Sequence, residues 1–187
     1  MTTTQKERTT MRSTLIAAGA AAAALAGSVV VGGTVNAADA HPSQGVQPIV
    51  TTEKGIVLEC TGEARGLSAY VNLYENDTFT NYVQVILNDK PGLAASREPK
   101  DILSDGVVKT SVDIKGKRAK ITGTASKVGK RKHVHEEIDD AGYRVVSDGW
   151  HRQLAHDLTL TYGGTAVDLT CAPAFFYKLE VTKTPIS

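Results

Sequence analysis

The sequence lacks the compact motifs by which many enzymes are recognised. It has no Gly-x-Ser-x-Gly nucleophile elbow, no His-Glu-x-x-His zinc motif and no glycine-rich phosphate-binding loop. The neighbouring carboxylates of Glu136 and Glu137 would point to opposite faces of a strand, so they cannot act together on one bond. These absences favour a non-enzymatic protein; they indicate no catalytic residue and imply no cofactor.

Long apolar runs are also missing, except at the N-terminus, where residues 15–31 are mostly apolar. Lys6, Arg8 and Arg12 precede this run, and residues 35–37 and 38–40 match small-x-small cleavage sites. The pattern predicts a signal peptide over residues 1–40, and therefore a secreted, extracellular protein. A retained membrane anchor is the alternative, since the run is as long as the shortest spanning helices, but the Ala-rich composition and the cleavage sites favour removal. We expect a bacterial source from the Ala- and Thr-rich composition of this region.

Net charge is the third absence. Removal of residues 1–40 would take away three of the 21 basic and two of the 20 acidic residues, which leaves a formal charge of zero. A neutral chain has no field to attract nucleic acid or an anionic surface, so we expect neither nucleic acid nor a membrane as partner. The 147 residues left of the 187 are the size of one domain with its own core.

Helical periodicity is absent after the signal peptide, whereas apolar and polar residues alternate with a period of two in many segments. The short links between these segments predict an all-β antiparallel meander of about 8–10 strands. A sheet of this size would expose long edges, so we expect closure into a β-barrel, with a β-sandwich as the alternative. The predicted organisation is a flexible leader at residues 41–54 and a β-barrel domain at residues 55–187.

The hairpin predicted over residues 154–171 links the two ends of this domain. Its strands alternate on either side of Gly163-Gly164, a dipeptide suited to a tight turn, and the second strand ends at Cys171. The only other cysteine, Cys60, ends the first strong alternation. Two cysteines in an exported chain indicate one disulfide, Cys60–Cys171, with two buried free thiols as the alternative.

Residues 89–105 are the only long interruption of the strand pattern. Pro91-Gly92 predicts a turn, and Pro99 suits the first turn of a short helix over residues 96–103. This segment is the candidate lid of the barrel.

One cluster has the chemistry of metal ligands. His133, His135 and Glu137 would share one face of a strand, so two imidazoles and a carboxylate could point at one ion. The alternative is a solvated, charge-rich hairpin, which is common and contributes little to stability.

Four residues are candidates for ligand binding inside the barrel. His156 lies among leucines on the inward face of its strand, where a core histidine with a hydrogen-bond partner is the alternative to a ligand-binding group. Gly123 and Ala125 are small inward residues that leave space in a barrel. Trp150, the only tryptophan, either stacks on a ligand or plugs the barrel.

Three functions follow from these observations. The first is a secreted barrel that binds a small apolar or amphipathic ligand in its lumen. The second is an interaction module or inhibitor that meets an extracellular protein through exposed loops or through Tyr70, Tyr74 and Tyr82. The third is a metal-binding protein or enzyme that uses the hairpin with His133 and His135.

Overall fold

A computed structural model describes residues 47–186 of the chain. The predicted signal peptide at residues 1–40 and the first six residues of the predicted leader lie outside the described residues. The fold is all-β, as the alternation predicts. Its elements are β1 (Ile49–Ala64), β2 (Leu67–Asn76), β3 (Tyr82–Leu87), a 3₁₀ turn η1 (Pro91–Leu93), β4 (Ala94–Arg97), β5 (Leu103–Ser104), β6 (Val107–Ile114), β7 (Lys117–Lys127), β8 (Lys132–Asp140), β9 (Tyr143–Tyr162) and β10 (Thr165–Pro185).

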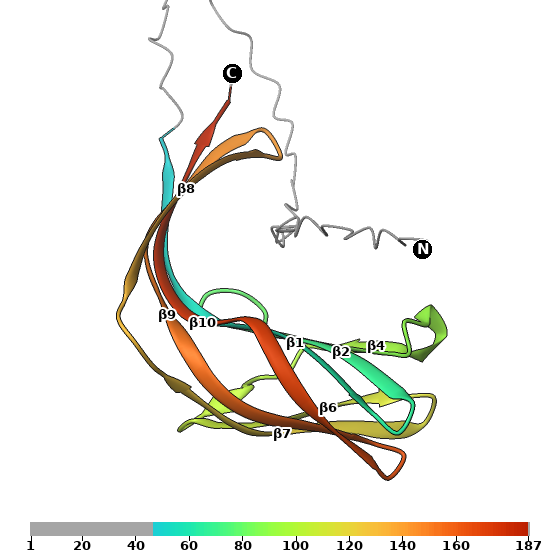
Figure 1. Ribbon diagram of the computed structural model, residues 1–187. Coiled ribbons are helices and arrows are strands. Elements are labelled where there is room, and N and C mark those ends of the chain that lie inside the picture. Colours follow the sequence, from blue (N-terminus) through green and yellow to red (C-terminus); the bar gives the residue numbers. More distant parts are fainter. Residues whose placement is uncertain (1–46, 187) are drawn as a thin grey trace, which may run out of the picture. The chain divides into compact units, whose positions relative to one another are not determined.

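The ten strands form one antiparallel sheet that curls into a half-barrel (Figure 1). Its order is β4-β3-β2-β1-β10-β9-β7-β6-β5, with β8 paired to β9 beside this path. Strands β4 and β6 lie near each other across the curl, where Arg97 donates a hydrogen bond of 3.2 Å from Nη2 to Oγ1 of Thr110. No described backbone pairing joins β4 to β5 or β6, so side chains rather than strand pairing span the gap.

The inner face of the half-barrel is a filled apolar core. Along β6 and β7 buried and exposed residues alternate, as expected for strands with one face against a core. Large aliphatic side chains from most strands meet in this core, including Leu58, Leu73, Leu87, Ile114, Ile121, Leu154, Leu158 and Leu160.

Strand β9 is longer than the sequence pattern predicts. The second arm of the charged hairpin and the strand over residues 154–162 form one continuous strand of 20 residues. One end of β9 pairs with β8 and the other with β7, while β10 follows β9 along almost its whole length. The polar residues 151–153 look like a link in the sequence, but their backbone pairs with β10 and continues the strand.

The long strands therefore leave the half-barrel and form an extension, which we define as residues 49–54, 132–140, 143–152 and 177–185 (Figure 1). It consists of the first part of β1, strand β8, the first half of β9 and the last part of β10. β1 begins at Ile49 and pairs with β10 from there, so residues 49–54 of the predicted leader belong to a strand.

Residues 89–105 contain no helix over residues 96–103, so that prediction is wrong. η1 precedes the short strand β4, and β5 follows after a bend. Pro99 disfavours helical backbone in the residue before it. The Glu75 carboxylate then accepts hydrogen bonds from the backbone N–H groups of Ile102 (2.6 Å) and Leu103 (2.9 Å), which fixes this segment against β2.

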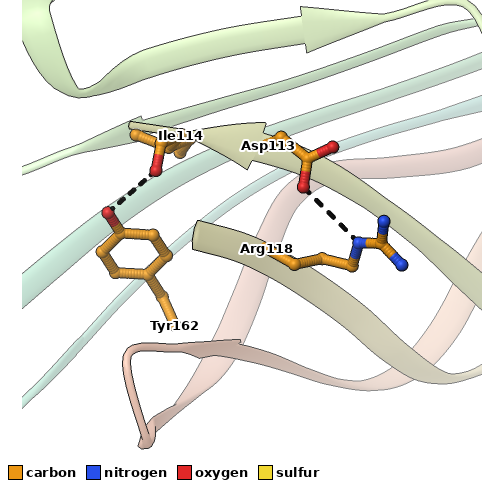
Figure 2. Close-up of polar contacts among 4 residues, drawn as sticks. All are labelled: Asp113, Ile114, Arg118 and Tyr162. Carbon is orange, nitrogen blue, oxygen red and sulfur yellow. Dashed lines mark hydrogen bonds and ion pairs between the residues drawn. The ribbon is translucent and has the colours of Figure 1, made fainter. Parts of the chain in front are cut away.

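The β9–β10 hairpin turns at Gly163 and Gly164, as predicted, with positive φ at both residues. Next to it, the Tyr162 hydroxyl donates a hydrogen bond of 3.2 Å to the carbonyl oxygen of Ile114, as Figure 2 shows. The ion pair between Arg118 and Asp113 in the same view closes the β6–β7 hairpin. The Tyr162 hydrogen bond thus attaches the end of β9 to the end of β6.

The predicted disulfide is confirmed: Cys60 of β1 and Cys171 of β10 are bonded and lie directly opposite each other in the sheet. Next to it β10 has a bulge of one extra residue. Leu58 and Cys60 are two positions apart, whereas their partners Ala174 and Cys171 are three positions apart. The bulge reverses the alternation of β10, so that Val167, Leu169 and Cys171 face the core before it and Phe176 faces the core after it.

We expect the double substitution Cys60→Ser and Cys171→Ser to lower the free energy of unfolding by about 4 kcal/mol. The two cysteines are 111 positions apart, and opening so large a loop increases the entropy of the unfolded chain. Urea unfolding of the variant and of the wild type measures the difference. Chemical reduction of the wild type should give a similar loss, and a loss below about 1 kcal/mol would contradict the expectation.

Candidate functional site

The half-barrel has a cavity of about 720 Å³ at the end where the extension begins. Binding sites for small molecules usually have volumes of about 300–1,000 Å³. Three buried apolar side chains form part of its wall: Ala125 of β7, Leu154 of β9 and Phe176 of β10. Of these, Ala125 was predicted as a ligand-binding residue. Opposite them lie β1, the end of β2 and the loop of residues 100–106, so the predicted lid segment does contribute to the cavity.

Lysines from three elements line this cavity: Lys54 of β1, Lys100 of the loop and Lys127 at the end of β7. The Lys127 ammonium group lies 3.5 Å from the centre of the Phe176 ring, a cation–π contact. Lys127 is exposed, but its ammonium group is partly desolvated, which lowers its pKa, and the nearby charges of Lys54, Arg152 and Arg131 lower the pKa further. The positive charges are thus close enough to repel one another, and an anion between them would relieve that repulsion.

Carboxylates also line the cavity, but two of the four already accept backbone hydrogen bonds. Glu75 binds the N–H groups of residues 102 and 103, and Asp77 Oδ1 accepts from the N–H of Lys54 at 2.8 Å. The other two, Asp101 and Asp105, are exposed on the loop. None of the ion pairs among residues 47–186 involves Lys54, Lys100 or Lys127.

A buried asparagine, Asn76, holds one wall of the cavity in place. Its side-chain Nδ2 donates to the hydroxyls of Tyr177 (2.7 Å) and Tyr74 (2.9 Å), and its Oδ1 accepts from the N–H groups of Thr78 and Phe79. Burial raises the pKa of the Tyr177 hydroxyl, which keeps it protonated as a donor to Tyr74. This network was not predicted from the sequence.

Of the four predicted ligand-binding residues, only Ala125 lines the cavity. Gly123 is explained by backbone packing, because a Cβ at this position would lie 1.9 Å from the carbonyl oxygen of Asp157 on β9. Its small size therefore allows close approach of a strand and does not leave space for a ligand.

His156 lies directly opposite Ala125, but its ring forms a hydrogen bond with the backbone of β10. The backbone N–H of Cys171 donates a hydrogen bond of 3.0 Å to Nε2, so Nε2 is unprotonated and Nδ1 carries the proton of the neutral ring. Nδ1 faces the carbonyl oxygen of Leu154 at 3.4 Å. The arrangement matches the alternative of a core histidine with a hydrogen-bond partner, and it satisfies an N–H group that the bulge takes out of the sheet pairing.

Trp150 lies in the extension, outside the lining of the cavity. Its indole ring packs against Phe176 with 5.6 Å between ring centres. The Arg131 guanidinium lies 4.2 Å from the centre of the same indole ring. Because Phe176 also lines the cavity, Trp150 packs against one wall of it, on the same face of the sheet as Phe176.

The predicted metal ligands separate into two ion-pair groups. Asp148 of β9 binds His135 Nδ1 at 2.9 Å and His133 Nε2 at 3.5 Å, whereas Glu137 pairs with Arg144 at 3.1 Å. The hydrogen bond from His135 lowers the pKa of Asp148, with a further contribution from His133. Within residues 47–186 no group of three or more His, Cys, Asp or Glu side chains is arranged to hold a metal ion.

The tyrosines named as a second candidate surface do share the outer face of the sheet. Tyr74 of β2 lies directly opposite Tyr82 of β3, and Tyr70 lies four positions from Tyr74 on the same face. All three are half-buried.

Comparison with known proteins adds no assignment, because no protein-family model, no curated protein and no solved structure matches the chain. In the part of the chain that the structure describes, no helix has the length and apolar composition needed to cross a membrane.

We expect His156→Leu to lower the free energy of unfolding by about 1–3 kcal/mol, since it leaves the N–H of Cys171 without its acceptor. His156→Gln is the matched control, because its side-chain oxygen can accept the same bond and should recover part of the loss. Chemical denaturation of the three proteins measures the effect. Equal stability of the leucine variant and the wild type would show that the bond is unimportant.

Proposed function

We propose that the protein is an exported binding protein that holds a small amphipathic ligand in the cavity at the end of the half-barrel. The single observation that supports this most is the combination of an apolar wall with lysines around one cavity of about 720 Å³. Sites for small molecules are mostly apolar with a few polar groups that orient the ligand.

The two lysines on the strands, Lys54 and Lys127, favour a ligand with an acidic head group placed between them, while the four carboxylates of the lining leave the cavity as a whole without net positive charge. An apolar portion would contact Ala125, Leu154 and Phe176, and the acidic group would lie between Lys54 and Lys127. The repulsion that lowers the pKa of Lys127 would then be replaced by attraction. The core beneath the cavity is filled, so this ligand would occupy the end of the half-barrel and not its centre.

Export is part of the proposal. The predicted signal peptide leads the chain out of the cytoplasm, and the Cys60–Cys171 disulfide supports an oxidising compartment. A protein in that compartment would bind its ligand outside the cell. No nucleic acid is expected as a partner, since the mature chain carries no net charge.

The experiment titrates the full chain with a fluorescent fatty acid as probe. We expect Ala125→Leu to weaken binding at least about tenfold, because the larger side chain enters the volume of the apolar wall. Ala155→Leu is the matched control, since Ala155 is exposed on the neighbouring strand outside the cavity and should leave the affinity unchanged.

Lys127→Gln provides a second measurement that does not alter the buried wall, because Lys127 is exposed. It should weaken binding of the fatty acid more than binding of the corresponding uncharged alcohol. If the wild type binds neither probe, or if both cavity variants bind like the wild type, the proposal is wrong. The outer surface with Tyr70, Tyr74 and Tyr82 is then the remaining candidate, acting on an extracellular protein.

A further inference from the structure

Strand β8 has one free edge. Among the described strands it pairs only with β9, and eight of its nine residues are exposed. A strand of this length with an unpaired edge presents a row of N–H and C=O groups that can pair with another chain. The other free edges are shorter: β4 and β5 have four and two residues, residues 49–54 of β1 pair with β10 alone, and residues 109–114 of β6 pair with β7 alone.

The geometry of the β8–β9 hairpin determines which residues of β8 face the free edge. Ala141 and Gly142 form a two-residue turn, so the flanking residues Asp140 and Tyr143 are opposite each other. Residues that flank such a turn exchange hydrogen bonds, and hydrogen-bonded pairs then alternate with non-hydrogen-bonded ones. The odd-numbered residues 133, 135, 137 and 139 therefore direct their N–H and C=O groups away from β9.

The charges along β8 are complementary to those of the same strand running in the opposite direction. The strand begins with Lys132 and His133 and ends with Asp139 and Asp140. When two copies pair in antiparallel fashion with Glu136 at the centre, Lys132 lies opposite Asp140 of the second copy and His133 lies opposite Asp139. His135 lies opposite Glu137. The Lys132–Asp140 pair joins opposite charges directly across the two strands, which stabilises their pairing, and the two imidazoles can hydrogen-bond to the carboxylates opposite them.

We propose that β8 pairs with β8 of a second copy of this chain, which gives a two-fold symmetric dimer. The register agrees with the backbone, because it pairs odd-numbered residues with odd-numbered residues, and these carry the free N–H and C=O groups. The contact is the same patch on both copies, as closed two-fold symmetry requires.

Polar contacts within each copy extend across this interface. Asp148 already contacts His135, and Arg144 already contacts Glu137. In the dimer the His135 ring faces Glu137 of the second copy, so a row of polar side chains runs from Asp148 of one copy to Arg144 of the other. The Glu136 pair at the centre is the one like-charge contact, and both carboxylates are exposed to solvent.

An apolar contact accompanies the charges on the other face of the sheet. Val134 of one copy lies opposite Ile138 of the second, and Ile138 is 36% exposed in the single chain. Ile138 is also opposite Val145 of its own β9, and Val145 is buried. Pairing would therefore join the two apolar faces of the extensions into one.

Cysteine cross-linking tests the register. In the dimer, residue 136 faces its own counterpart in a non-hydrogen-bonded pair with Cα atoms about 4.5 Å apart, within the range of a disulfide. Glu136→Cys should therefore form a covalent dimer on mild oxidation. Lys132→Cys is the matched control on the same exposed face, and its counterpart would lie about 27 Å away, too far to react.

Sedimentation equilibrium of the full mature chain tests the association itself. The wild type should dimerise with rising concentration, and His135→Pro should not, because it removes an N–H at the free edge without disturbing the β8–β9 bonds. His135→Ala keeps that N–H and should weaken the dimer by less than about tenfold.

Three outcomes would overturn the proposal. They are a wild type that stays monomeric at its highest soluble concentration, equal cross-linking of Glu136→Cys and Lys132→Cys, and a His135→Pro variant that dimerises like the wild type. A monomer would indicate that the charges on β8 protect the edge from association.

Discussion

The structure depends most on the pairing of β10 with both β1 and β9 around its bulge. The bulge adds one residue to β10 beside the disulfide, and the neutral ring of His156 accepts the N–H of Cys171 there. The alternation of β10 is reversed beyond this point. Without the reversal Phe176 would face outward, and the cavity would lose its largest apolar group. One backbone irregularity thus connects the half-barrel, the extension and the candidate site.

The cavity lies where the sheet changes from a filled core to a four-stranded extension. On one side the aliphatic side chains of the core exclude water, and on the other the strands carry charged residues on a face that nothing in residues 47–186 covers. A site at this boundary combines apolar and charged groups without burying an unpaired charge in the core. The same change in surroundings explains why Lys127 can lie over the Phe176 ring at this end of the half-barrel.

Much of the fold could be predicted from the sequence, because period-two alternation and the Gly163-Gly164 turn report local structure directly. The disulfide was also predictable, since only one pairing of two cysteines exists. The cavity was not: Phe176 reaches it only through the bulge, and Lys54 only because β1 begins within the predicted leader. Ala125 was predicted from its size and inward position. Gly123 is also small and inward, but because a strand packs closely against it, and His156 is inward because its ring accepts a hydrogen bond from Cys171. The partner of His133 and His135 proved to be Asp148, which the alternation of a single strand could not reveal.

The single tryptophan gives the extension a spectroscopic signal of its own. Trp150 belongs to the extension, packs on Phe176 and lies against Arg131, while the core of the half-barrel contains no tryptophan. Its intrinsic fluorescence therefore reports on the extension and on the wall shared with the cavity. Far-ultraviolet circular dichroism, in contrast, follows the whole sheet. If the extension loses its structure before the half-barrel on heating, the two signals will separate, and the native chain contains this reporter without any label.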